Sequence, residues 1–163
     1  MAALAGITGF YSNHASLSSP VLEGAADTLM LTSFPDLSGN QQTLSHWRGD
    51  VLVVNFWATW CAPCREEIPA LMRVQQEYAD KNLKIVGIGV DSEVKIKNYA
   101  AEMRINYSLL IGGVEILEMS KGLGNRAEVL PFTVVLDRAG KVAYAHAGAL
   151  TKVALDAVLA PLL

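Results

Sequence analysis

Blocks of apolar and polar residues alternate along this chain, and their spacing predicts strands and helices in turn. Val51 to Trp57 is a near-continuous apolar run, which is typical of a central strand buried on both faces. From Cys61 to about Ala79 the apolar residues instead recur every three or four positions, which predicts a helix with Pro69 inside it. The pattern therefore places a strand and then a helix around the segment that joins them.

The same alternation continues to the end of the chain. Further strands are predicted over Ile85–Val90, Tyr107–Ile111, Phe132–Leu136 and Val142–Ala147. Further helices are predicted around Ile96–Met103, Ile116–Leu123 and Leu155–Leu162. The last two strands are separated only by a short turn, so they form a hairpin. Strands that alternate with helices and end in a hairpin indicate an α/β fold with a mixed central sheet.

A β-hairpin is predicted in front of this alternation. Thr28–Leu31 and Gln42–Leu44 flank the segment Asp36–Asn40, in which Gly39-Asn40 is a turn signal. We therefore expect these two short runs to pair as strands ahead of the main sheet.

Composition supports one folded domain over residues 21–163. The chain has 163 residues, of which 52% are hydrophobic, and this is enough to bury a sizeable core. Its net charge of −3 argues against nucleic acid or an anionic membrane as a main partner.

Residues 1–20 differ from the rest, because no Lys or Arg occurs before Arg48. Met1–Tyr11 is apolar but too short to span a bilayer, and it lacks the basic start of an intact signal peptide. One interpretation is the residue of a trimmed export signal or anchor. The other is a flexible N-terminus, native or introduced for expression.

Cys61 and Cys64 are the only cysteines, and they lie three positions apart where the helix is expected to begin. A disulfide that closes so short a loop constrains the unfolded chain very little, so redox chemistry is the better interpretation. The unpaired N–H groups of a helix N-terminus favour the thiolate of Cys61, which would be the attacking group. Cys64 would be more buried and would resolve the mixed disulfide.

Other functions for the cysteine pair are less compatible with the sequence. A closed zinc or iron–sulfur site needs four ligands, and no second cysteine pair exists. Peroxiredoxin chemistry gives no reason for a second thiol at this spacing, and a copper chaperone of the Sco kind needs a wider one. A non-catalytic binding module of the same fold, with incidental thiols, is the remaining alternative.

The stretch Val53–Pro69 (VVNFWATWCAPCREEIP) resembles the active-site segment of the thioredoxin superfamily, and more narrowly that of the TlpA/ResA-like thiol–disulfide oxidoreductases of bacterial envelopes. The resemblance extends over roughly Asp27–Leu162 and includes the N-terminal hairpin and a strand–helix insert from Val86 to Ile111. It implies a thioredoxin-like fold and the reduction of protein disulfides.

The resemblance also assigns site residues. Leu130-Pro131 corresponds to the cis-proline bond that faces the cysteine pair, where the backbone of Leu130 can pair with an extended substrate. Glu67 lies three residues beyond Cys64 on the same side of the helix, and the resemblance implies that it handles protons. Asn55 stands where ordinary thioredoxin has a buried aspartate. We expect Trp60, just before Cys61, to offer an apolar surface to partners.

We therefore predict a protein disulfide reductase that needs no bound cofactor, because the electrons reside in the two sulfur atoms. The resemblance implies a periplasmic location, an inner-membrane electron donor of the DsbD/CcdA kind and a monomer. A disulfide-forming oxidase shares the same chemistry and stays open as the alternative. The Pro-Glu-Thr loop expected of dedicated cytochrome-c maturation proteins is absent, since the chain has Glu128–Thr133 at that place.

Overall fold

A mixed five-stranded sheet forms the centre of the computed structural model, which describes residues 20–163. Its strands are β3 (Val51–Trp57), β4 (Leu83–Gly89), β5 (Ser108–Ile111), β6 (Phe132–Leu136) and β7 (Val142–Ala147). They are ordered β5-β4-β3-β6-β7, with β3, β4 and β5 parallel and with β6 antiparallel to both of its neighbours. The predicted α/β fold with a mixed sheet is confirmed.

The middle strand β3 lies at the centre of the core. All seven of its residues are buried, and it pairs with β4 on one side and β6 on the other. Its sequence is apolar except for Asn55, as expected of a strand covered on both faces. The end of β3 therefore holds the segment that follows it in a fixed place.

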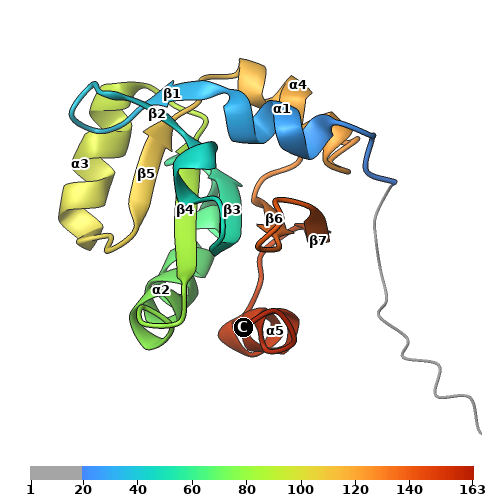
Figure 1. Ribbon diagram of the computed structural model, residues 1–163. Helices are drawn as coiled ribbons and strands as arrows, with labels where there is room; N and C mark the ends of the chain where they lie inside the picture. The colour runs from blue at the N-terminus through green and yellow to red at the C-terminus, as the bar shows by residue number, and fades with distance from the viewer. Residues whose placement is uncertain (1–19) are drawn as a thin grey trace, which may run out of the picture.

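Helices cover both faces of this sheet. They are α1 (Ala25–Leu31), α2 (Ala62–Glu77), α3 (Glu93–Met103), α4 (Glu115–Gly122) and α5 (Lys152–Leu159). Figure 1 shows α2 and α5 side by side below the strands, and α1 together with α4 above them. Because β3, β4 and β5 are parallel neighbours in sequence order, right-handed crossovers place α3 on the same face as α2. In the described range 20–163, we find no helix with the length and apolar character needed to cross a membrane.

The N-terminal hairpin is present, but its first strand was predicted in the wrong place. Thr28–Leu31 belongs to helix α1, and the hairpin pairs β1 (Ser33–Pro35) with β2 (Gln41–Thr43). The turn between them is held by Asp36, whose Oδ1 accepts hydrogen bonds from the backbone N–H groups of Ser38 and Asn40. A bridge between Asp36 and Leu110 attaches the hairpin to the edge strand β5.

The domain prediction is only partly covered by these residues. Residues 1–19, nearly all of the expected N-terminal segment 1–20, lie outside the described residues. The first contacts of the described chain include a hydrogen bond from the Leu22 N–H to the carbonyl of Gly122, which joins the start of the domain to the end of α4.

Candidate active site

The two cysteines form a disulfide at the start of α2, immediately after the end of β3. Cys61 is the N-cap of α2, in an extended conformation, and Cys64 lies in the first turn, so that their Cα atoms are 5.3 Å apart. Pro63 occupies this first turn, where its missing N–H leaves no helical hydrogen bond unmade. The short loop after β3 therefore places the two cysteines at the N-terminus of α2.

The two sulfur atoms differ in their surroundings. Cys61 is 6% exposed and Cys64 is 1% exposed, which confirms the expected difference in burial. The Sγ atom of Cys61 accepts a hydrogen bond from the backbone N–H of Cys64 at 3.3 Å. After reduction, this donor and the helix N-terminus favour negative charge on Cys61.

The loop before Cys61 is tied to the next strand. Thr59 donates a side-chain hydrogen bond to Oδ2 of Asp91, which directly follows β4 and also accepts from the backbone N–H of Ser92 at 2.7 Å. Burial acts to raise the pKa of Asp91, but these hydrogen bonds together with the nearby ammonium group of Lys95 outweigh it and hold that pKa below its ordinary value. Trp60, between Thr59 and Cys61, is 65% exposed, so it is available to a partner.

The predicted cis peptide bond between Leu130 and Pro131 is present. Phe56 of β3 pairs with Phe132 of β6, so the register places Pro131 opposite Trp57, at the end of β3 that leads to Cys61. Pro131 is buried and Leu130 is half-buried. The strand pairing thus brings Leu130 and Pro131 to the same end of the sheet as the disulfide.

The loop that precedes Pro131 is held by a residue that the sequence analysis missed. Asn125 is 1% exposed, and its side-chain amide donates to the carbonyl of Val129 at 3.0 Å and accepts from the backbone N–H of Val129 at 3.1 Å. The same amide donates to Ser120 Oγ at 3.0 Å, which ties the loop to α4. Its place after Gly122 and Gly124, where α4 ends, is the only local signal in the sequence.

Glu67, one turn of α2 beyond Cys64, is buried rather than exposed on the surface of the helix. It is 2% exposed, its Oε1 accepts from the backbone N–H of Leu150 at 2.8 Å, and its Oε2 accepts from Nδ2 of Asn55 at 2.9 Å. Burial raises the pKa of Glu67 from 4.5 to about 7, although both hydrogen bonds act to lower it. A carboxyl group in this condition can bind and release a proton near neutral pH.

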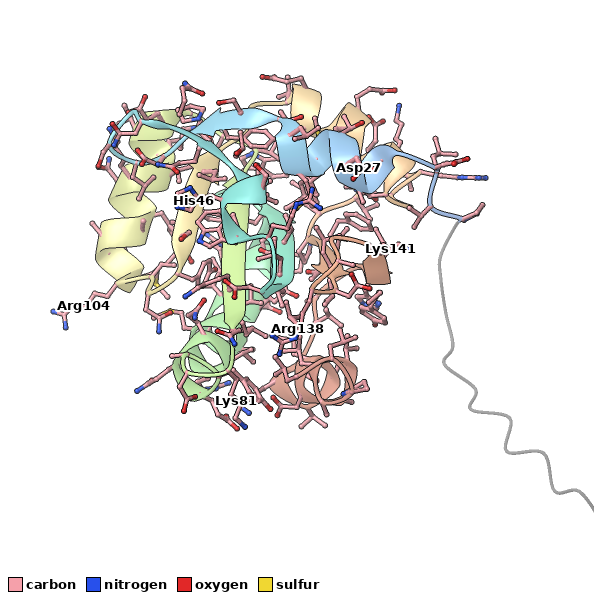
Figure 2. All side chains as sticks on the ribbon, viewed as in Figure 1. Asp27, His46, Lys81, Arg104, Arg138 and Lys141 are labelled. Atoms are coloured by element: carbon pink, nitrogen blue, oxygen red, sulfur yellow. A yellow bond between two sulfur atoms is a disulfide. The ribbon has the colours of Figure 1, made fainter. Side chains whose placement is uncertain are left out.

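The three histidines are scattered along the sequence. His46 lies on the short 3-10 helix Leu44–Trp47 (Figure 2), His146 lies on β7, and His14 is outside the described residues. Within residues 20–163, no three His, Cys, Asp or Glu side chains are placed to hold a metal ion together.

Dithiol–disulfide exchange is the chemistry that Cys61 and Cys64 can perform in this position, and the fold and the pair together define a thiol–disulfide oxidoreductase of thioredoxin-like architecture. The chain belongs to the AhpC/TSA family, whose model matches residues 25–145.

Curated relatives agree with this class. The chain is similar to the thioredoxin-like protein YneN of Bacillus subtilis (strain 168), with 37% identity over 122 residues, which covers 74% of this chain and 69% of that protein. It is also similar to the thiol-disulfide oxidoreductase ResA of Bacillus anthracis, with 28% identity over 125 residues, 76% of this chain and 70% of the relative.

Solved structures give the same result. A thiol:disulfide interchange protein of the thioredoxin family from Chlorobium tepidum TLS superimposes with a TM-score of 0.71 and 28% identity, covering 80% of this chain and 92% of that one. A secreted thiol-disulfide isomerase from Corynebacterium glutamicum gives a TM-score of 0.74 and 27% identity, covering 80% and 82%. The protein is therefore an enzyme of the oxidoreductase class.

Proposed function

We propose that this protein reduces disulfide bonds of other proteins in the bacterial envelope. The observation that carries the direction is the buried carboxyl group of Glu67, one turn of α2 beyond Cys64. Negative charge on Glu67 disfavours a second negative charge on a nearby thiolate, and Pro63 supplies no N–H to stabilise one. A dithiol whose thiolate is less stabilised gives up its electrons more readily, as a reductase requires.

The reaction proceeds in two exchange steps. The Cys61 thiolate attacks a substrate disulfide, a bond forms between the two sulfur atoms, and one substrate thiolate leaves. Cys64 then transfers its proton to Glu67 and attacks Cys61, which releases the second substrate thiolate and leaves the Cys61–Cys64 disulfide. The substrate gains two electrons, and the enzyme loses two.

Three further residues form the substrate-binding surface in this proposal. Trp60 offers an exposed aromatic face beside Cys61. Leu130 and Pro131 lie at the adjacent strand end, where the Leu130 backbone can pair with an extended segment of the substrate. This surface would hold the substrate disulfide against Cys61, the more exposed of the two cysteine residues.

The location and the electron source are part of the same proposal. One structural neighbour is described as secreted, which supports a periplasmic location for this chain. A periplasmic reductase must be re-reduced after each cycle, and an inner-membrane thiol donor of the DsbD/CcdA kind would do this. We propose that the enzyme acts as a monomer and that residues 21–163 are its catalytic domain.

Trapping of the mixed disulfide tests the assigned roles of the two cysteines. The Cys64→Ser variant keeps the attacking thiol but cannot resolve, so it should accumulate a covalent complex with a disulfide-bonded test protein on non-reducing gels. The Cys61→Ser variant should form none. If Cys61→Ser traps the substrate instead, or keeps wild-type exchange activity, the assignment is wrong.

A further inference from the structure

Asn55 is the one polar residue of the central strand β3, and its amide reaches Glu67 of α2. Nδ2 donates to Oε2 of Glu67 at 2.9 Å and to Oγ1 of Thr133 at 3.0 Å. Asn55 is 1% exposed and Thr133, its partner across β3 and β6, is fully buried. The buried amide of Asn55 therefore connects the carboxyl group of Glu67 to the hydroxyl group of Thr133.

The oxygen atom of this amide, Oδ1, differs from the nitrogen atom in its hydrogen bonding. Among residues 20–163, no group hydrogen-bonds to Oδ1 of Asn55, although that atom is fully buried. A buried acceptor without a partner costs free energy, so the orientation seen here is held by the two bonds that Nδ2 makes. The bond from Nδ2 to Oε2 suits an ionised Glu67, because a carboxylate only accepts hydrogen bonds.

A protonated Glu67 has different requirements. Its Oε1 faces the backbone N–H of Leu150, which can only donate, so an added proton is compatible only with Oε2. Oε2 would then become a donor and would oppose the Nδ2 donor of Asn55. Rotation of the amide by half a turn removes this conflict, since Oδ1 then accepts from Glu67, and the hydroxyl group of Thr133 can reverse and donate to Oδ1. The buried position without a partner then passes from Oδ1 to Nδ2.

From this geometry we propose that Asn55 is a positioning residue for Glu67 and that its amide turns over when Oε2 takes up a proton. The inference rests on the proposed function, in which that proton comes from Cys64: the S–H bond breaks, the O–H bond forms on Oε2, and the thiolate left behind attacks Cys61. The departing substrate thiolate takes the proton back. The Asn55 amide rotates and the Thr133 hydroxyl group changes from acceptor to donor at the same time. The carboxyl group of Glu67 is therefore hydrogen-bonded both before and after the proton transfer.

Other titratable groups surround Glu67. Cys64 shares its helix, and Tyr107, just before β5, has a raised pKa through burial first and the charge of Glu67 second, so it stays protonated. His146 lies opposite Thr133 on β7, and burial lowers its pKa below the ordinary value of 6.5. Its own resonances allow its titration to be followed separately.

Some charged groups of the neighbouring helices form ion pairs of their own. On α5, Lys152 forms ion pairs with Asp156 and with Glu77, near the far end of α2. On α3, the Tyr99 ring packs against Trp57, and Arg65 acts on the pKa of Tyr99.

Nuclear magnetic resonance on the disulfide form tests the proposal without requiring exchange activity. In the wild type, the side-chain amide resonances of Asn55 should change with pH at the same midpoint as the carboxyl carbon of Glu67. Asn55→Leu removes a hydrogen bond from both forms of Glu67, and the bond to the charged form is the stronger of the two, so the Glu67 midpoint should rise by about half a unit to one unit, a three- to tenfold change in proton affinity. The matched control Thr133→Val keeps the bond between Asn55 and Glu67 and should shift the midpoint by less than half as much.

Constant Asn55 amide resonances through the Glu67 midpoint would overturn the proposal, as would an unchanged midpoint in Asn55→Leu. A purely structural role would lower stability in that variant and leave the midpoint in place. If Asn55→Leu does not fold, the wild-type titration still decides. The titration uses the disulfide form and needs no exchange activity. If the trapping experiment with Cys64→Ser fails, that failure contradicts the proposed function, and the titration of Glu67 and Asn55 can still be interpreted.

Discussion

Glu67 gives the molecule a stability that depends on pH. Its pKa is raised from 4.5 to about 7 by burial, so between these values the folded protein holds a proton that the unfolded chain has lost. The free energy of unfolding therefore falls as the pH rises through this window and levels off above it. Compared with Glu67→Gln, the wild type should lose about 3 kcal/mol between pH 4.5 and pH 8.

Urea unfolding of both proteins at the two pH values measures this difference. Glu66→Gln is the matched control, because Glu66 is the exposed neighbour on the same helix and its replacement keeps the buried carboxyl group of Glu67. Equal pH dependence in the wild type and in Glu67→Gln would show that Glu67 does not carry a raised pKa.

Trp60 should affect protein substrates more than small ones. Its side chain is 65% exposed, so Trp60→Ala should leave stability nearly unchanged while it removes an aromatic contact beside Cys61. We expect kcat/KM for a protein disulfide to fall about tenfold, as for an interface residue of moderate importance. Val153→Ala, at a site 79% exposed on α5, controls for the loss of apolar surface. An equal loss of kcat/KM with a small aromatic disulfide as substrate would contradict a role of Trp60 in docking protein substrates.

At the residue scale, the sequence was sufficient for the cysteine pair and insufficient for its supports. Cys61 and Cys64 are recognised by their spacing alone. The bonds of Glu67 to Asn55 and Leu150 join residues 12 and 83 positions apart, and that of Thr59 to Asp91 spans 32. No local pattern reports such contacts, because they depend on how strands and helices pack.

At the scale of elements, the bond between Thr59 and Asp91 joins the catalytic loop to the start of α3. Thr59→Val should lower the free energy of unfolding by about 1 kcal/mol, the usual contribution of one hydrogen bond. The amide of Cys61, which donates to the carbonyl of Ala58 at 3.2 Å, should exchange its hydrogen faster. Thr59→Ser keeps the hydroxyl group and serves as the control, and identical behaviour of the two variants would mean that the bond does not hold the loop.

Most elements were predictable because their patterns are long or strongly periodic. Phe132–Leu136 and Val142–Ala147 are strands as expected, and α2 matches its apolar spacing. Thr28–Leu31 was misassigned because a short apolar run fits a strand or a helix equally well. The preceding Ala25-Ala26 and the Leu and Met residues of the run favour a helix, and the packing of α1 against α4 supports it.

At the scale of the whole molecule, the strand order decides where the chemistry can occur. β3 and β6 are neighbours, so the segment leading to Cys61 and the one containing Pro131 emerge at one end of the sheet. The sequence predicted the strands and the resemblance predicted this juxtaposition. The catalytic roles of these residues, and the assignment of residues 21–163 as the functional domain, stay predictions.

The reduction potential of the Cys61–Cys64 couple, measured by equilibration with glutathione or dithiothreitol at pH 7, tests the central claim most directly. A reductase should give a value near that of thioredoxin, about −270 mV, or lower. A value of about −120 mV would mean that the reduced, dithiol form of the pair is strongly stabilised relative to its disulfide form. The protein would then act as a disulfide-forming oxidase, and the proposed direction of electron flow would be wrong.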